Sequence, residues 1–304
     1  MDVSALRRQA GLLPARLWLL LGTGGLVLGV LTANASLAAA AKPSTCTGSL
    51  EAPGTLVGTY ASNVTVDGVC AVDAGQAIVE GNLKLTPGSA LVAAFALDDQ
   101  TGSGSSGLTV DGNLQVQRGA AMLLGCNPKS FACIDSGELS STDTISGNLS
   151  EQQPLGVVVH NTTIGGNVQE TGGGGGFTCE PLGAFGAFHS PVYSDYEDST
   201  VNGNLDVIGL TSCWLGVARV HVGGNLDMIH NQLADPDAIE IVSNQISGNL
   251  LCRQNSQVWD SGEENPATLF PRIPQPDTVL GRRVGQCVLS CPTPDGGWPG
   301  PGLF

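Results

Sequence analysis

The sequence predicts an all-β protein, a single-stack parallel β-helix (β-solenoid) over residues 42–291. Three observations predict this fold. A five-residue phrase, apolar-x-Gly-Asn-apolar, occurs seven times. The residues that follow it alternate between apolar and polar, as Leu83-Lys84-Leu85 does, which is typical of a half-buried strand. A unit of this kind cannot bury its apolar side alone, so it must stack on the next unit.

The repeated Gly-Asn pair predicts a sharp corner between strands. Glycine is favoured where φ is positive, since a Cβ costs roughly 1–2 kcal/mol there, and asparagine is the next most tolerant residue. Stacked coils would place the asparagines one above another as an internal amide ladder. Antiparallel hairpins are the alternative, although they do not require one fixed Gly-Asn context. The predicted corner residues are Gly81, Asn82, Gly112, Asn113, Gly147, Asn148, Gly166, Asn167, Gly203, Asn204, Gly224, Asn225, Gly248 and Asn249.

The spacing of the corners indicates where insertions lie. Successive repeat glycines are 31, 35, 19, 37, 21 and 24 residues apart. The three shorter intervals match one coil, whereas the longer ones need a loop on one corner or an additional degenerate coil. Gly-rich and polar stretches at 98–107 and 171–176 favour loops in two of them. We expect the aromatic-rich segment 180–198 to be the largest irregular insertion.

Residues 1–41 have the features of a targeting segment that forms a signal or anchor helix. Arg7, Arg8 and Arg16 supply positive charge, and the stretch 17–33 contains no charged residue. Small residues follow it in a pattern suited to cleavage. An uncleaved membrane anchor is the alternative, for which the apolar stretch is barely long enough. We therefore expect export, followed by cleavage near residue 41.

The charge balance excludes one class of partner. The chain has 27 acidic and 12 basic side chains, a formal net charge of −15 at pH 7, and three of the arginines lie in the targeting segment. So acidic a protein repels nucleic acids and anionic lipid surfaces. We expect no nucleic-acid partner, and membrane contact only through residues 1–41 if they are not cleaved.

The nine cysteines all follow the targeting segment, and with an export signal they predict structural disulfides in an oxidising compartment. Sequence does not fix their pairing, but proximity along the chain favours four pairs and leaves one thiol over, for which Cys291 is the candidate. A metal site is not expected from Cys287 and Cys291, because no second pair of ligands accompanies them. The candidate pairs are Cys46–Cys70, Cys126–Cys133, Cys179–Cys213 and Cys252–Cys287.

Both ends of the solenoid are expected to be atypical coils. Residues 64–70 have the shape of the corner without its asparagine, and residues 278–281 repeat it once more. The prolines of 253–277 indicate an extended strap that precedes a C-terminal cap tied down by a disulfide. The composition of residues 292–304 predicts a disordered tail.

The sequence contains no recognisable catalytic, cofactor-binding or metal-binding motif, and no cofactor is expected. None of the four histidines lies between two glycines, as in polygalacturonases, and there is no Gly-x-Ser-x-Gly elbow. We interpret the acidic clusters as solvated charges on loops, although carboxylates from different coils could still form a glycoside-hydrolysing pair. The acidic candidates are Asp98, Asp99, Asp195, Glu197, Asp198, Asp235, Asp237, Glu263 and Glu264.

Several of these features together resemble a group of uncharacterised secreted actinobacterial β-helix proteins. They are Cys46-Thr47-Gly48, the repeated Gly-Asn-Leu units, and the stretches 248–252 and 279–287. The resemblance covers most of the chain after the targeting segment; it implies the β-helix fold and secretion, and it assigns no chemistry. The repeats also resemble those of bactofilin-type polymer-forming proteins, which are typically cytoplasmic and lack disulfides. The aromatic insertion departs from the short coils of such proteins.

These features predict an exported structural or binding protein of the cell surface, either secreted or anchored by its N-terminal segment. Its expected partner is a cell-envelope glycan or a surface protein. The alternatives are a carbohydrate-active enzyme, either a polysaccharide lyase or a glycoside hydrolase, and a filament-forming protein. A cleft with paired carboxylates would favour the enzyme, and flat, uncapped terminal coils would favour the filament.

Overall fold

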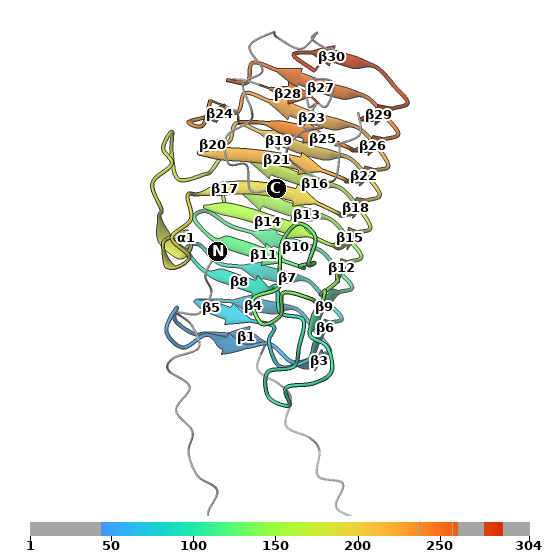
Figure 1. Ribbon diagram of the computed structural model, residues 1–304. Helices are drawn as coiled ribbons and strands as arrows, with labels where there is room; N and C mark the ends of the chain where they lie inside the picture. Colours follow the sequence, from blue (N-terminus) through green and yellow to red (C-terminus); the bar gives the residue numbers. More distant parts are fainter. Residues whose placement is uncertain (1–43, 237, 257, 261–276, 288–304) are drawn as a thin grey trace, which may run out of the picture. The chain divides into compact units, whose positions relative to one another are not determined.

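The computed structural model describes residues 44–236, 238–256, 258–260 and 277–287. Within these residues strands far outnumber helical residues, and the three long sheets contain only parallel pairs (Figure 1). Each turn of the chain adds one strand to each sheet, so successive coils stack as a parallel β-solenoid. The parallel β-helix predicted from the repeats is therefore confirmed. The targeting segment, the stretch 261–276 and the tail 292–304 lie outside the described residues.

Three sheets, named A, B and C here, form the faces of the stack. Sheet A contains β1 (Thr45–Cys46), β4 (Val64–Val66), β7 (Leu83–Leu85), β10 (Leu114–Val116), β13 (Leu149–Gln152), β16 (Val168–Thr171), β19 (Leu205–Ile208), β23 (Leu226–Ile229), β27 (Leu250–Arg253) and β30 (Arg283–Gly285). Sheet B contains β2 (Gly54–Thr55), β5 (Val69–Ala71), β8 (Ala90–Ala93), β11 (Ala121–Leu124), β14 (Gly156–His160), β17 (Tyr193–Glu197), β21 (Trp214–Ala218), β25 (Glu240–Val242) and β28 (Trp259–Asp260).

Sheet C and two small elements complete the fold. Sheet C contains β3 (Gly58–Tyr60), β6 (Gln76–Val79), β9 (Gly107–Val110), β12 (Asp143–Ile145), β15 (Thr162–Ile164), β18 (Thr200–Val201), β22 (His221–Val222), β26 (Gln245–Ile246) and β29 (Thr278–Val279). The small sheet pairs β20 (Thr211–Ser212) with β24 (Gln232–Leu233), and the short helix is α1 (Gly183–Ala187).

The core is a set of apolar rows that run up the inside of the stack. In sheet A, Leu83, Leu114 and Leu149 lie directly above one another, and each is fully buried. Burying one such side chain contributes about 1.5–3 kcal/mol. Since each leucine covers that of the neighbouring coil, the apolar side of every coil is buried only when the coils are stacked.

The seven Gly-Asn pairs lie at the turn from sheet C to sheet A, and their asparagines form a ladder. Each Asn Oδ1 accepts a hydrogen bond from the backbone N–H of the corresponding residue in the next coil, at 2.8–2.9 Å. The ladder begins one coil earlier than expected, at Asn63, and its last donor is the N–H of Arg282. Its asparagines are half-buried or exposed, so the expectation of an internal ladder is wrong.

The corner glycines are required for a different reason from the one predicted. None of the seven has a positive φ. A Cβ on Gly112 would instead lie 2.6 Å from the carbonyl oxygen of Gly81 and 2.7 Å from Oδ1 of Asn82. The backbones of successive coils are hydrogen-bonded at this corner, from the N–H of Gly112 to the carbonyl oxygen of Gly81 at 3.0 Å. Glycine is needed because the coils approach one another too closely for a side chain.

Positive φ is found at the next turn, from sheet A to sheet B. Gly88 and Gly119 have φ of 75° and 70°, and the equivalent Gln153 has φ of 53°. The opening corner was expected at residues 64–70, and this position is wrong. These residues form strand β4 and the turn from sheet A to sheet B. The asparagine corner of that coil lies just before β4, at Asn63.

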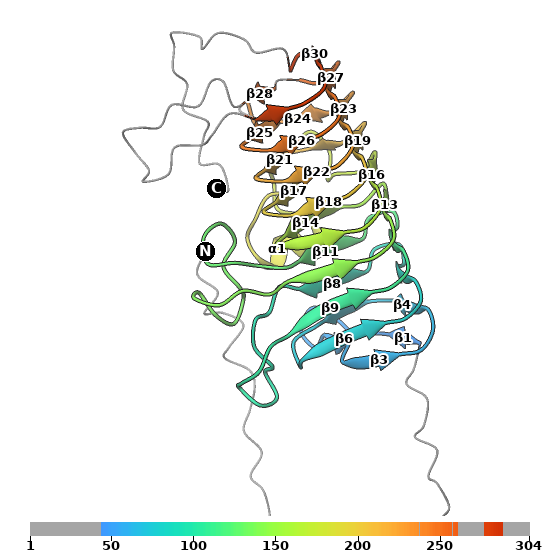
Figure 2. The same cartoon turned by 90° about the vertical axis from the view of Figure 1, so that its right-hand side faces the viewer.

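The longer repeat intervals contain loops and no additional coil. The three insertions are 94–106 between β8 and β9, 125–142 between β11 and β12, and 172–192 between β16 and β17. All three border sheet B: the first two follow one of its strands and the third precedes one. Figure 1 shows the segment with α1 beside β14 and β17, and Figure 2 shows the other insertions standing out to one side of the stack.

Four disulfides fasten the ends of the stack and its insertions, and they are the four pairs that proximity favoured. Two of them join different coils near the two ends, and one closes a loop within the insertion 125–142. The fourth ties the insertion 172–192 to the residue that precedes β21. The pairs are Cys46–Cys70, Cys126–Cys133, Cys179–Cys213 and Cys252–Cys287.

Candidate functional site

The insertions cover one part of sheet B, where the strands are buried on both faces. Every residue of β14, β17 and β21 is buried. In β17 the side chains alternate, so that Ser194 and Tyr196 face the inside of the solenoid and Asp195 and Glu197 face outward, beneath the insertions. The result is two polar clusters on opposite faces of the same strand.

The outer cluster is built around His160, at the end of β14. Its Nε2 lies 3.1 Å from Oδ2 of Asp195, and its Nδ1 lies 3.5 Å from Oε2 of Glu197. Parallel pairing places Val158 beside Asp195 and His160 beside Glu197. The side chains of His160, Asp195 and Glu197 are 2%, 2% and 0% exposed, so the cluster is closed to solvent.

Arg219 connects the outer cluster to the turn from sheet B to sheet C. Its guanidinium contacts the carboxylate of Glu197 and donates two hydrogen bonds to Asp198, at 2.7 and 3.1 Å. Asp198 and Arg219 occupy equivalent turn positions in adjacent coils, with φ of 48° and 57°. The same turn also has positive φ at Asn161 and Ser243 in neighbouring coils, so this backbone conformation belongs to the repeating coil.

The loop 126–133 closes over this cluster. The ring of Phe131 stacks on the imidazole of His160, with centroids 4.6 Å apart and planes 19° apart. Side chains of Asn127 and Ser130 donate hydrogen bonds to Oδ2 of Asp198, and the Cys126–Cys133 disulfide closes the loop. The 126–133 loop therefore covers His160 and helps to close the outer cluster to water.

Burial decides the protonation of the outer cluster. It raises the pKa of Glu197 to about 8 and that of Asp195 well above its usual range. It lowers the pKa of His160 to about 4, so the imidazole is neutral near pH 7 and its contacts with the two carboxyl groups are not ion pairs. Burial alone would raise the pKa of Asp198 too, but hydrogen bonds from Arg219 and Ser130 lower it.

The inner cluster interrupts an apolar row of sheet A. The row runs Leu85, Val116, Glu151, Glu170 and Val207 in register, and both glutamates are fully buried. From sheet B, the Tyr196 hydroxyl lies 2.6 Å from Oε2 of Glu151 and 3.1 Å from Oε2 of Glu170. Burial raises the pKa of both carboxyl groups, that of Glu170 to about 7.

The inner cluster makes a testable contribution to the pH dependence of stability. The pKa of Glu170 rises from 4.5 to about 7 on folding, so its stabilising contribution is full below pH 4.5 and is lost as the pH rises through 7. Gln at position 170 cannot ionise, and its amide suits the Tyr196 hydroxyl. We expect Glu170→Gln to raise the midpoint of thermal unfolding at pH 8 by roughly 5–10 °C and to change it little at pH 5.

The matched control is Glu80→Gln, because Glu80 is exposed after β6. Thermal unfolding followed by circular dichroism at pH 5 and pH 8 measures both variants. The stability of both variants still depends on pH to some extent, since burial also raises the pKa of Asp143 to about 7. An equal effect of Glu170→Gln at both pH values would contradict the assignment.

Three aromatic side chains, two of them from the segment 180–198, cover part of sheet B. Phe185, Tyr193 and Trp214 form a chain of edge-to-face contacts, with centroids 5.3 and 6.1 Å apart. Phe185 lies on Gly156, and the Trp214 ring lies on Gly216. All three side chains are buried. The expected irregular insertion therefore ends at residue 192, and 193–197 is a strand.

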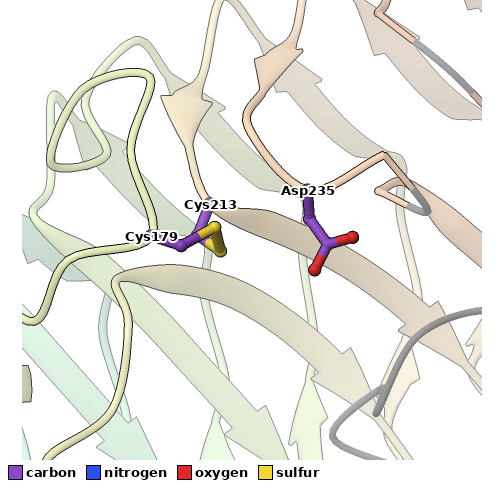
Figure 3. Close-up of side chains that lie close together, drawn as sticks. All are labelled: Cys179, Cys213 and Asp235. Carbon is purple, nitrogen blue, oxygen red and sulfur yellow. A yellow bond between two sulfur atoms is a disulfide. The ribbon is translucent and has the colours of Figure 1, made fainter.

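A second group of possible ligands lies beside the insertion 172–192. Cys179, Cys213 and Asp235 lie close together, as Figure 3 shows. The two sulfur atoms form a disulfide, and a disulfide lacks the thiolate that a metal ion requires. This group is therefore a structural cross-link.

The structure separates the acidic candidates that the sequence grouped together. Asp98 and Asp99 lie in the insertion 94–106, as expected for loop charges. The interpretation of Asp195 and Glu197 as solvated is wrong, because both lie buried in β17. Asp237, Glu263 and Glu264 lie outside the described residues. Of the four histidines only His160 joins an acidic cluster; the others, His189, His221 and His230, are exposed.

Two signals in the sequence could have indicated these clusters. Tyr193, Asp195 and Glu197 alternate with period two, which indicates a strand and not a loop. Glu151 and Glu170 each follow a Gly-Asn corner by three or four residues, at positions where other coils have an apolar residue. Neither signal identifies His160 as the partner, because the contact depends on which coils are neighbours.

The fold defines the class of protein: a disulfide-linked parallel β-solenoid with a closed polar cluster beneath loops on one face. In the part of the chain that the structure describes, no helix is long and apolar enough to span a membrane. Comparison with protein-family models finds no match, and no curated protein or solved structure matches the chain. A function must therefore be inferred from the site itself.

Proposed function

We propose that this chain is an exported structural or binding protein of the cell surface, and that its solenoid binds an extended cell-envelope glycan along sheet A. Four disulfides support an oxidising environment, since they form and persist outside the reducing cytosol. The resemblance to secreted β-helix proteins agrees with export through the N-terminal segment.

The observation that carries the proposal is the regular outer face of sheet A. One outward row is polar over six successive coils, and each of its residues is half-buried or exposed. Neighbouring strands are about 4.8 Å apart, so these polar groups repeat at a constant spacing, as do the hydroxyl groups of an extended polysaccharide. The row contains Lys84, Gln115, Ser150, Gln169, Asp206 and Asp227.

The C-terminal end of this face is hollowed. A shallow depression there combines amide, carboxylate and guanidinium groups with two apolar side chains, a mixture that provides donors and acceptors for sugar hydroxyls. Asp227 is partly buried in it, which raises the pKa of its carboxyl group, while Arg253 lowers it. The depression is lined by Asn225, Asp227, Asn249, Leu251, Arg253, Arg282 and Val284.

Binding of the purified protein without residues 1–41 to an array of envelope glycans tests the proposal. We expect the double variant Gln169→Ala/Asp206→Asn to weaken binding by roughly tenfold, or about 1.4 kcal/mol. The control is Thr163→Ala, which changes an exposed outward residue of sheet C. Equal binding by all three proteins, or no bound glycan, would refute the proposal.

A carbohydrate-active enzyme is the second candidate, and the outer cluster is the observation that favours it. His160, Asp195 and Glu197 bring a histidine and two carboxyl groups together, and glycoside hydrolysis requires two carboxyl groups. Their burial opposes this function, since substrate would reach them only if the 126–133 loop opened. Analysis of the same glycans for cleavage products, with Asp195→Asn as the inactive control, distinguishes the enzyme from the binding protein.

A further inference from the structure

The outer cluster has the donor set of a metal site. One imidazole nitrogen of His160 and one oxygen each of Asp195 and Glu197 lie within 4.8 Å of one another. The distance of 3.1 Å between Nε2 of His160 and Oδ2 of Asp195 is close to the roughly 3.3 Å that separates two ligands of a tetrahedral zinc ion. The ligands come from adjacent strands of a sheet, which holds them rigidly.

The charges of the cluster leave room for a divalent cation. Among the residues that the structure describes, three carboxyl groups lie here, those of Asp195, Glu197 and Asp198, and the guanidinium of Arg219 offsets the charge of one. His160 contributes no charge when neutral. Two negative charges would thus remain in a largely buried group of side chains, and burying unpaired charge is costly. Either protons or a bound cation must neutralise them.

Within the described residues, several buried polar atoms of the outer cluster have no hydrogen-bond partner. Oδ1 of Asp195 and Oε1 of Glu197 are buried without a hydrogen-bond partner, and no well-aligned hydrogen bond reaches either ring nitrogen of His160. Buried polar atoms nearly always have a partner. Here the unsatisfied atoms belong to three neighbouring side chains that are all ligands of transition metals.

We propose that His160, Asp195 and Glu197 bind a divalent transition-metal ion, with Zn²⁺ or Mn²⁺ as the fitting ions. One nitrogen and two oxygen donors suit these ions, whereas Ca²⁺ and Mg²⁺ prefer oxygen ligands alone. Arg219 holds Oε2 of Glu197 and leaves Oε1 for the ion. Phe131 fixes the plane of the imidazole and covers the site.

Metal loading tests the proposal. The protein without residues 1–41 and without a histidine tag is unfolded in guanidinium with EDTA, its disulfides intact, and refolded with Zn²⁺ or with Mn²⁺. After desalting, we expect about one ion per chain by mass spectrometry and an unfolding midpoint several degrees higher than without metal. Less than one ion in ten chains with both metals would overturn the proposal in favour of a protonated cluster.

Two variants and one probe assign the ligands. His160→Ala and Asp195→Asn should each lower the affinity for the ion more than tenfold, whereas Glu80→Gln, at an exposed carboxylate after β6, should retain it. If neither ligand variant folds, Co²⁺ bound to the wild-type protein answers the question through its visible absorption, which a histidine and two carboxylates shift from that of hydrated Co²⁺. A spectrum of hydrated Co²⁺, or unchanged affinity in Asp195→Asn, would contradict the assignment.

Discussion

Gly112→Ala is expected to destabilise the solenoid by about 2–5 kcal/mol, enough to lower the unfolding midpoint by roughly 5–20 °C. The added Cβ would lie 2.6 Å from the carbonyl oxygen of Gly81 and 2.7 Å from Oδ1 of Asn82. Neither atom can move freely, because both belong to the hydrogen bonds that join successive coils. The corner must therefore open, and with it the stacking of the coils on either side.

Alanine substitutions at two further glycines distinguish a steric clash from backbone strain as the cause of the destabilisation. Gly119 has φ of 70°, and a Cβ added to it would lie 3.9 Å from the nearest atom, so Gly119→Ala should cost only about 1 kcal/mol. Gly137 has an ordinary φ and open space around it, so Gly137→Ala should be neutral within about 0.5 kcal/mol. Thermal and denaturant unfolding rank the three variants. Equal midpoints for Gly112→Ala and Gly137→Ala would refute close coil contact as the reason for the repeat glycine.

Refolding of the fully reduced chain is expected to fail until its disulfides form. Each of the four disulfides restricts the unfolded chain, and for loops of these lengths this adds about 2.5–4 kcal/mol to the free energy of unfolding. Together they contribute about as much as the whole net stability of a typical domain. Without the disulfides the end coils are no longer cross-linked to their neighbours. The insertions around the outer cluster also lose their covalent cross-links.

The chain is reduced in guanidinium, diluted with or without a glutathione redox buffer, and followed by circular dichroism and thiol counting. We expect a β-sheet spectrum only in the oxidising buffer. Cys291→Ser is the control and should refold like the wild-type chain, because it leaves all four pairs intact. Full recovery of the spectrum under reducing conditions would show that packing of the apolar rows alone sustains the stack.

The local elements of the fold could be predicted because they depend on short-range chemistry. The phrase apolar-x-Gly-Asn-apolar repeats the same corner, and period-two alternation such as Leu83-Lys84-Leu85 specifies which side chains face inward. Parallel stacking followed, since such a unit can bury its apolar side only against another. The disulfide partners are close to one another along the chain, so proximity alone favoured the correct pairs.

Positive φ is the wrong reason for the repeat glycine, because a rule about a residue's own backbone does not describe a contact between coils. Positive φ explains a glycine from its own backbone, and it applies at Gly88 and Gly119. At Gly112 the obstacle is a carbonyl oxygen that belongs to the preceding coil. No property of the five-residue phrase by itself distinguishes these two causes.

The sequence by itself determined the repeating coil, the direction of its side chains and the residues of its corners. The tertiary structure alone decided that His160 meets Asp195 and Glu197, and that Glu151 and Glu170 meet Tyr196 inside the core. These contacts depend on the register between neighbouring coils and on which insertion folds over which strand. Register is set by the summed burial of every coil in the stack, so a site built across coils emerges only when all of them are in place.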